Sequence, residues 1–168
     1  MSRLKISALI LAGMLVLFLV SVAATYSLLP ERLATHFGAS GRPDGWMPRS
    51  HYLTSIPGVG LLVAAGLVAL FYVLRFLPVS LLNIPHRDYW LTPERLPRVW
   101  ESLLVVGLRL AALELVFFLG IHFLTLYANT HPPVHLPGLA IAGLSVASLA
   151  GTVWVILSVA RSFNRIDR

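Results

Sequence analysis

The sequence predicts an all-α integral membrane protein with four transmembrane helices, a structured outer loop and a cytoplasmic loop that carries a short interfacial helix. Hydrophobic residues make up 57% of the 168 positions and charged residues only 12%. Residues 6–29, 52–74 and 136–160 contain no charged side chain, and residues 102–130 contain two. About 20 apolar residues are enough for a helix to cross the ~30 Å hydrocarbon core of a bilayer. We therefore expect a single four-helix membrane domain over residues 1–168, with spans near 6–28, 53–76, 101–127 and 137–160.

The basic residues predict the orientation of these spans. Nine of them flank the spans on one side: Arg3, Lys5, Arg75, Arg87, Arg95, Arg98, Arg161, Arg165 and Arg168. Three lie in the loop after the first span: Arg32, Arg42 and Arg49. Loops rich in Lys and Arg stay in the cytoplasm. We expect the protein to lie in the cell membrane with both termini cytoplasmic.

Composition also excludes some classes of function. The net charge is +6, but the arginines are not interleaved with aromatic residues, so nothing indicates binding to nucleic acid. There is no cysteine, which rules out disulfides and thiolate metal sites. An alternative concerns the N-terminus, where two basic residues, an apolar run and the small residues at 21–24 could form a cleavable signal peptide. The apolar run is longer than the 7–15 residues typical of such peptides, which favours a membrane span.

The longest polar break, residues 29–46, predicts an ordered outer loop. Gly41 and Gly45 can adopt a positive φ, and Pro43-Asp44-Gly45 is a turn sequence in which Asp44 acts as a local cap. We expect His36, Asp44 and Trp46 to organise this loop or to bind a ligand or partner.

The second polar segment, residues 78–98, contains the candidate contact residues Asn83, Tyr89 and Trp90. Thr92-Pro93-Glu94 is typical of a helix start, with Thr92 as N-cap and Pro93 at the first helical position. We expect a short helix there that lies along the membrane and enters the third span at a bend marked by Pro97.

These two polar segments together resemble a known family. The motifs are Leu29-Pro30-Glu31, Thr35-His36-Phe37, residues 41–46, Asn83-Ile84-Pro85 and residues 89–95. They are similar to the bacterial membrane domain of unknown function found at the N-terminus of Sdp-type toxin-immunity proteins, and to its short stand-alone members. The resemblance covers residues 29 to about 98 and implies a bacterial multi-pass membrane protein. It assigns neither an immunity function nor a catalytic residue.

The third predicted span holds the only charges within a membrane segment, Arg109 and Glu114. An ionised carboxylate near the bilayer centre costs at least ~2.5 kcal/mol, so Glu114 is a candidate proton site, ion site or counter-charge for a partner. The structural alternative is a protonated or paired Glu114 that fixes helix packing. Five residues of separation place the two side chains about 140° apart on a helix, so each needs a partner elsewhere.

Five of the six histidines fall on the predicted outer side: His36, His51, His122, His131 and His135. Imidazole ligands, together with the carboxylate of Asp44, suit Zn²⁺ or Cu²⁺. Polar contacts with lipid headgroups are the simpler interpretation of these side chains, and no cofactor is firmly implied.

Two classes of function stay open. The first is a non-enzymatic module that binds a peptide, a toxin or a partner membrane protein, in an immunity-like or signalling-like role. The second is a metal- or proton-dependent membrane enzyme or carrier that uses the outer histidines and Glu114. The first is favoured because the polar loops are distinctive in sequence while no complete catalytic set is visible.

Overall fold

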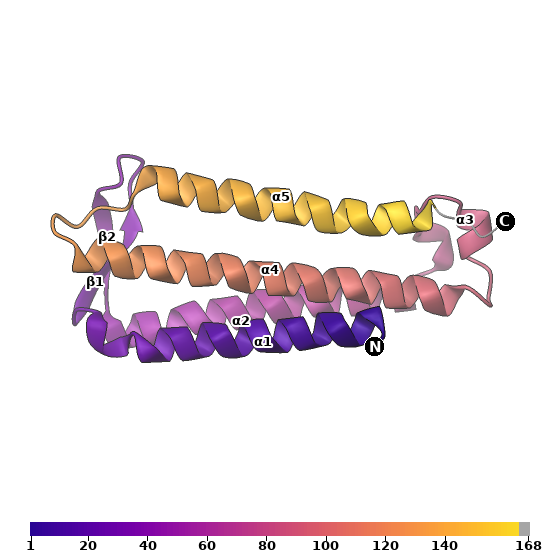
Figure 1. Ribbon diagram of the computed structural model, residues 1–168, viewed down its shortest axis with the longest axis horizontal. Coiled ribbons are helices and arrows are strands. Elements are labelled where there is room, and N and C mark those ends of the chain that lie inside the picture. Colours follow the sequence, from indigo (N-terminus) through magenta and orange to yellow (C-terminus); the bar gives the residue numbers. More distant parts are fainter. Residues whose placement is uncertain (165–168) are drawn as a thin grey trace.

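The computed structural model describes residues 1–164, and Figure 1 shows them as an elongated bundle of helices. Arg165 and Arg168, two of the nine basic residues used to predict orientation, lie outside the described residues. Four helices are long and apolar enough to cross a membrane: α1 (Arg3–Ala24), α2 (Arg49–Val73), α4 (Leu96–Thr130) and α5 (Gly138–Phe163). The four predicted spans are therefore confirmed as helices.

The chain runs up and down the bundle, so that its connections gather at two opposite ends. The N-terminus, the end of α5 and the short helix α3 (Arg87–Trp90) lie at one end, and the two strands and the α4–α5 connection lie at the other (Figure 1). We call these the terminal end and the hairpin end. Three short 3-10 turns, Tyr26–Leu28, Leu74–Phe76 and Val79–Leu81, lie at or near the ends of α1 and α2.

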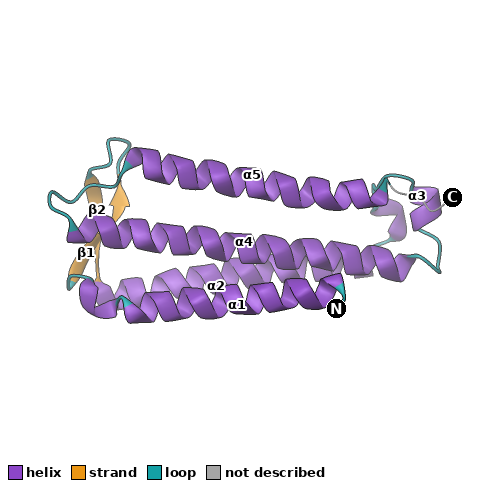
Figure 2. Ribbon diagram, viewed as in Figure 1, coloured by secondary structure: helices purple, strands orange, loops and turns teal. Residues whose placement is uncertain are grey.

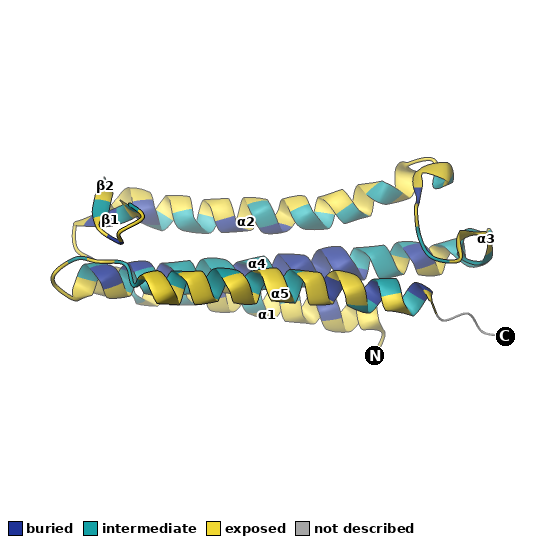
Figure 3. Ribbon diagram, turned by 90° about the horizontal axis from the view of Figure 1, so that it is seen from above, coloured by how far each residue is buried: buried dark blue, intermediate teal, exposed yellow. Residues whose placement is uncertain are grey.

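Helix α4 is the centre of the bundle, because α1, α2 and α5 each pack against it. Within the most apolar stretch of each helix, 44% of α4 is buried inside the chain, against 17%, 11% and 6% for α1, α2 and α5. Figure 3 shows the same distribution, with buried positions concentrated along α4. The outward faces of the other three helices are exposed and apolar, as lipid contact requires.

Close packing depends on small residues at the helix contacts. A Cβ at Gly60 of α2 would lie 2.9 Å from the Phe18 ring of α1, and one at Gly107 of α4 would lie 2.8 Å from Phe71 of α2. Gly151 of α5 meets Leu113 of α4 in the same way. Small residues let helix backbones approach closely in lipid, where burial of apolar surface adds no driving force.

The prediction of an all-α fold is wrong at the outer loop. β1 (Arg32–Phe37) and β2 (Pro43–Pro48) form a two-stranded antiparallel hairpin, which Figure 2 shows at the end of the bundle. The hairpin places Leu33 and Met47 opposite each other, packed with Leu29 and Tyr52 in a small apolar cluster. The sequence signal for these strands is an alternation of buried and exposed residues with a period of two. It was missed because the run is short and rich in glycine and proline.

The turn was also predicted at the wrong place. Residues 43–45 belong to β2, and the chain reverses at Gly38–Gly41, where the Gly41 amide donates to the Gly38 carbonyl at 2.8 Å. Gly41 has the expected positive φ, +77°, whereas Gly45 does not. Asp44 is therefore a strand residue and not a turn cap.

The short helix expected in the loop between the second and third spans exists but lies earlier than predicted. It is α3, Arg87–Trp90, and Thr92–Arg95 form a turn rather than the start of a helix. α4 begins at Leu96 with Pro97 in its first turn, where a missing amide hydrogen costs nothing. The Thr92 hydroxyl is a buried oxygen without a hydrogen-bond partner among the described residues, so Thr92 does not act as an N-cap.

Candidate functional site

The hairpin is tied to the end of α4 by one side chain, Asn129. Its Oδ1 accepts a hydrogen bond from the Ala34 amide at 2.7 Å, and its Nδ2 donates to the Ala34 carbonyl at 2.9 Å. Nδ2 also donates to the Thr125 carbonyl of its own helix at 2.9 Å. The amide thus takes the place of a neighbouring strand along β1 and satisfies both backbone groups of a fully buried residue.

Arg49, the first residue of α2, fixes the other end of the hairpin. Its guanidinium donates to the Leu29 carbonyl at 2.9 Å and lies 4.3 Å from the centre of the Tyr26 ring. Its backbone amide donates to the Glu31 carbonyl at 2.8 Å. The chain leaving α1 and the chain entering α2 are held together by this one residue.

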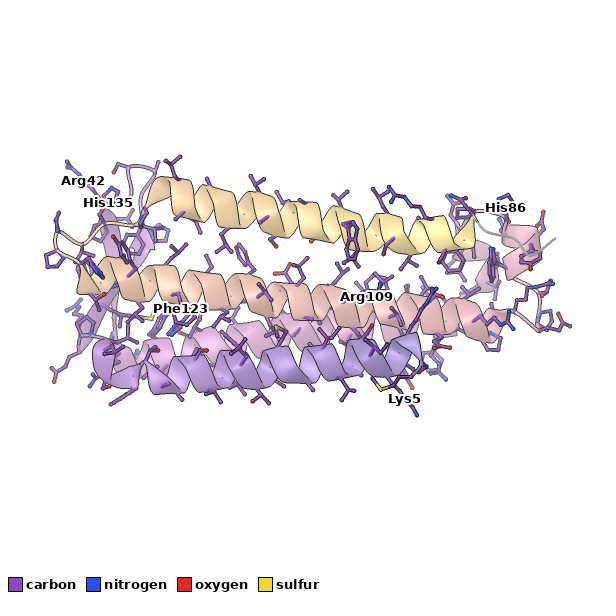
Figure 4. The ribbon with its side chains drawn as sticks, in the orientation of Figure 1. Lys5, Arg42, His86, Arg109, Phe123 and His135 are labelled. Carbon is purple, nitrogen blue, oxygen red and sulfur yellow. The ribbon has the colours of Figure 1, made fainter. Side chains whose placement is uncertain are left out.

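The hairpin tip is anchored to the α4–α5 connection. Leu136 donates its amide to the Gly41 carbonyl at 2.9 Å, and the His135 ring nitrogen Nε2 lies 3.0 Å from the Ser40 carbonyl. A Cβ at Gly41 would come within 2.6 Å of both His135 and the Leu136 carbonyl, so only glycine fits there. Figure 4 shows His135 and Arg42 together at this end of the molecule.

With three anchors on its inner side and tip, the hairpin presents an outer face that carries the predicted site residues. His36 Nδ1 is 2.5 Å from Asp44 Oδ1, with side chains 77% and 53% exposed. Each strand contains one residue more than a regular ladder, Thr35 on β1 and Asp44 on β2, and such a bulge turns a side chain out of its usual direction. Trp46 is exposed on the same hairpin. His36, Asp44 and Trp46 form what we call the outer face.

A buried polar contact lies beneath the hairpin. The sequence singled out His122 but did not predict which groups its ring contacts. His122 of α4 is fully buried, with Nε2 2.8 Å from the Thr25 hydroxyl at the end of α1 and Nδ1 3.0 Å from the Tyr52 hydroxyl of α2. The Thr25 hydroxyl donates its single proton to the Ser21 carbonyl at 2.8 Å. This arrangement suits a neutral His122 ring that donates from Nε2 and accepts the Tyr52 proton at Nδ1. Three helices meet at this imidazole.

The predicted metal ligands do not gather at one point. Among residues 1–164, no group of three or more His, Asp or Glu side chains is placed to hold a metal ion. His122 uses both ring nitrogens on hydroxyl groups, His131 lies beside the Tyr127 carbonyl at 2.9 Å, and His135 reaches Ser40. His51 is exposed in the first turn of α2.

At the terminal end, Trp90 ties a loop to the end of a helix, as Asn129 does at the hairpin end. Its indole nitrogen donates to the Phe163 carbonyl at 2.7 Å, satisfying one of the last carbonyls of α5. The Trp90 and Phe163 rings pack edge to face at 5.5 Å, and Arg95 lies 3.9 Å from the centre of the Tyr89 ring. Asn83 is exposed. Tyr89 and Trp90 are therefore docking residues for the loop.

The two charges singled out in the third predicted span, Arg109 and Glu114, have unequal surroundings. Arg109 donates from Nε to the buried Ser7 hydroxyl of α1 at 3.3 Å. Glu114 is half-buried near the middle of α4 and has no hydrogen bond or ion pair within the described chain. The two do not pair with each other, as their spacing predicted.

Sequence reasoning missed Asn129, Arg49, Thr25 and Tyr52 as contributors. A signal for part of this set was present, because His122, Thr125 and Asn129 are spaced by three and four residues and so share one face of a helix. A polar stripe at the end of an apolar span indicates a contact with something polar, here the hairpin and the neighbouring helix ends.

Comparison with known proteins gives a family name without a function. A family model described as a domain of unknown function (DUF1648) matches residues 12–61, a segment that contains the whole hairpin. The chain is 32% identical over 121 residues to an uncharacterized protein of Archaeoglobus fulgidus, a match that covers 62% of this chain and 60% of that protein. The chain thus spans less than two thirds of that relative. No solved structure matches.

Proposed function

We propose that this chain is a multi-pass protein of the cell membrane whose outer face binds a peptide or an exposed segment of a partner protein. The observation that carries the proposal is the contrast between the two sides of the hairpin. The inner side and tip are fixed by Asn129, Arg49 and Leu136, while the opposite side exposes Trp46 beside the His36–Asp44 pair.

A rigid display of this kind favours recognition. An aromatic side chain held in place loses little entropy when it enters a partner's pocket, and such residues dominate binding energy at interfaces. The family match supports the same region, because residues 12–61 contain the hairpin and Arg49, one of its three anchors. The resemblance to the N-terminal domain of Sdp-type toxin-immunity proteins favours a membrane-active peptide as the ligand.

The test compares two exposed tryptophans. A strain that lacks the protein is grown with the small-peptide fraction of its own spent medium and is complemented with wild type, Trp46→Ala or Trp154→Ala. Trp154 is 62% exposed on α5 and Trp46 is 45% exposed on the hairpin, so both variants remove a surface indole. We expect wild type and Trp154→Ala to restore growth and Trp46→Ala to fail at equal membrane abundance.

The same variants, purified in nanodiscs, give the binding result. Loss of a central aromatic anchor weakens an interface by about 2 kcal/mol or more, roughly thirtyfold in Kd. Full restoration of growth by Trp46→Ala, with unchanged peptide binding, would overturn the proposal.

A proton- or metal-dependent membrane carrier or enzyme is the second candidate, and Glu114 is the observation that favours it. A carboxyl group halfway along the central helix has no polar partner within residues 1–164, so its partner would be a proton, an ion or another chain. In the same complementation assay, this function requires Glu114→Gln to fail while Trp46→Ala succeeds.

A further inference from the structure

The terminal end of the bundle contains a basic cavity that none of the preceding assignments uses. Two adjoining hollows of about 260 and 620 Å³ lie between the start of α1, the start of α4 and the end of α5, and share most of their lining. Four guanidinium groups and a single carboxylate line them: Arg3, Arg98, Arg109, Arg161 and Glu101. Ser102, Ser158 and Ser162 supply the rest of the polar lining.

Among residues 1–164, these positive charges are only partly balanced by negative ones. In the part that the structure describes, His36–Asp44 is the one ion pair, so no carboxylate lies within 4.0 Å of these guanidinium groups. Arginine keeps its charge and has five N–H donors, and Arg109 uses one of them on Ser7. Four guanidinium groups in a cavity with a single carboxylate attract an anion, and phosphate is an anion whose geometry suits their paired donors.

The position of Arg109 along the bundle indicates which molecule would supply that phosphate. Its side chain bonds Ser7, only four residues after the first residue of α1, although Arg109 itself is well inside α4 (Figure 4). Long basic side chains in membrane helices extend toward the headgroup layer in this way. The guanidinium group therefore lies near the level where lipid phosphates sit.

An apolar groove continues from the cavity between the same three helices. It has a volume of about 430 Å³ and is lined by Ile10 and Met14 of α1, Leu113 and Val116 of α4, Trp154 of α5 and neighbouring apolar residues. Arg109 lines both the groove and the smaller basic hollow, so it stands at their junction. A basic hollow that shares Arg109 with an apolar groove suits a molecule with a phosphate at one end and a hydrocarbon chain at the other.

We propose that this combined site binds one anionic phospholipid, with its phosphate among Arg3, Arg98, Arg109 and Arg161 and an acyl chain in the groove. The sequence places this end on the cytoplasmic side, where anionic lipids are attracted to basic pockets between helices. The proposal is independent of what the hairpin binds, although it requires that the helices lie in a bilayer.

The test is a lipid titration of the full-length protein, delipidated in detergent and followed by native mass spectrometry. The probes are dioleoyl phosphatidylglycerol, dioleoyl phosphatidylcholine with the same chains and no net charge, and glycerol 3-phosphate with no chains. We expect phosphatidylglycerol to bind about tenfold more tightly than phosphatidylcholine, and excess glycerol 3-phosphate not to displace it.

Variants locate the bound lipid. Arg98 and Arg161 are exposed and have no hydrogen-bond partner among the described residues, so the double variant Arg98→Gln/Arg161→Gln should fold normally. We expect it, and Arg109→Gln, to bind phosphatidylglycerol about tenfold more weakly. The control Arg32→Gln/Arg42→Gln makes the same change of charge at the hairpin end and should bind as wild type does.

Three results would each overturn the proposal. Equal affinity for the two dioleoyl lipids would remove the role of charge. Displacement by glycerol 3-phosphate would make the cavity a site for a soluble phosphate ester. An equal loss in the hairpin-end control would make the attraction a property of net charge and not of this cavity.

Discussion

His122 satisfies both ring nitrogens with hydroxyl groups from two other helices, while its own helix is the centre of the bundle. A buried imidazole in this position costs stability unless each nitrogen has a partner. The stacking of its ring on Tyr52, with centroids 5.8 Å apart, adds to the packing at the same point. The side chain therefore specifies how the ends of α1 and α2 meet α4 and is unsuited to a metal.

Tyr52→Phe tests this account. The change keeps the ring but leaves Nδ1 of His122 without a donor inside the protein, so we expect the variant to be less stable by about 1 kcal/mol. The measurement is thermal unfolding in detergent, with Tyr127→Phe, an exposed tyrosine of α4, as the control. A Tyr52→Phe protein as stable as wild type would mean that the hydroxyl contributes nothing.

Glu114 presents the opposite case at the residue scale, because it lacks the partners that His122 has. If no group within the chain depends on its carboxyl, replacing it with an apolar residue removes a polar group from lipid and breaks no bond. We expect Glu114→Leu to unfold at a temperature no lower than wild type, and Glu114→Gln to match wild type. A clear drop for Leu alone would reveal a structural partner and support the interpretation that Glu114 fixes helix packing.

At the scale of elements, the hairpin depends on the helices for its stability. An isolated two-stranded hairpin is marginal in water, and this one has a short ladder interrupted by two bulges. Its order comes from Asn129, Arg49 and the α4–α5 connection, together with Leu33 and Met47 packed on the helix ends. The exposed His36–Asp44 pair adds little, since surface ion pairs contribute about 0–1 kcal/mol.

Asn129→Ala should therefore loosen the hairpin more than any change on its outer face. The variant loses two hydrogen bonds to Ala34, worth about 2 kcal/mol together, so cleavage by trypsin after Arg32 should accelerate. Asn129→Asp keeps the acceptor and loses the donor, and we expect an intermediate rate. Asn83→Ala, at the opposite end, is the control, and equal cleavage rates in all four proteins would show that other contacts hold the hairpin.

At the scale of the whole molecule, the basic residues are unequally divided between the two ends, because successive long helices run in opposite directions. Seven described basic residues lie at the terminal end and three at the hairpin end, with Arg109 within α4. This asymmetry predicts that the hairpin lies outside the cell and the terminal end inside. In the two proposals made above, the hairpin end binds an outer partner and the terminal end binds a lipid of the headgroup layer.

Single cysteines test this orientation directly, because the natural sequence has none. Ser40→Cys at the hairpin tip should react with a membrane-impermeant maleimide in whole cells, and Arg87→Cys in α3 should react only after the cells are opened. The opposite pattern would reverse the orientation, and reaction at both sites in intact cells would contradict a two-sided arrangement.

The sequence alone determined the number of helices, their approximate limits and which loops share an end. These properties follow from the lengths of the uncharged stretches. In a bilayer each span must also satisfy its own backbone hydrogen bonds, so contacts with other helices are not needed to predict it. It also singled out His36, Asp44, Trp46, Trp90, Arg109 and Glu114 as polar or aromatic residues in unusual places. Only the tertiary structure decided that α4 is the central helix, that residues 32–48 form a hairpin and that Asn129 holds it. The polar contacts that fix the hairpin and the helix ends join residues some 90 to 100 positions apart, as in Ala34–Asn129 and Thr25–His122, and local periodicity contains no information about which distant groups will satisfy each other.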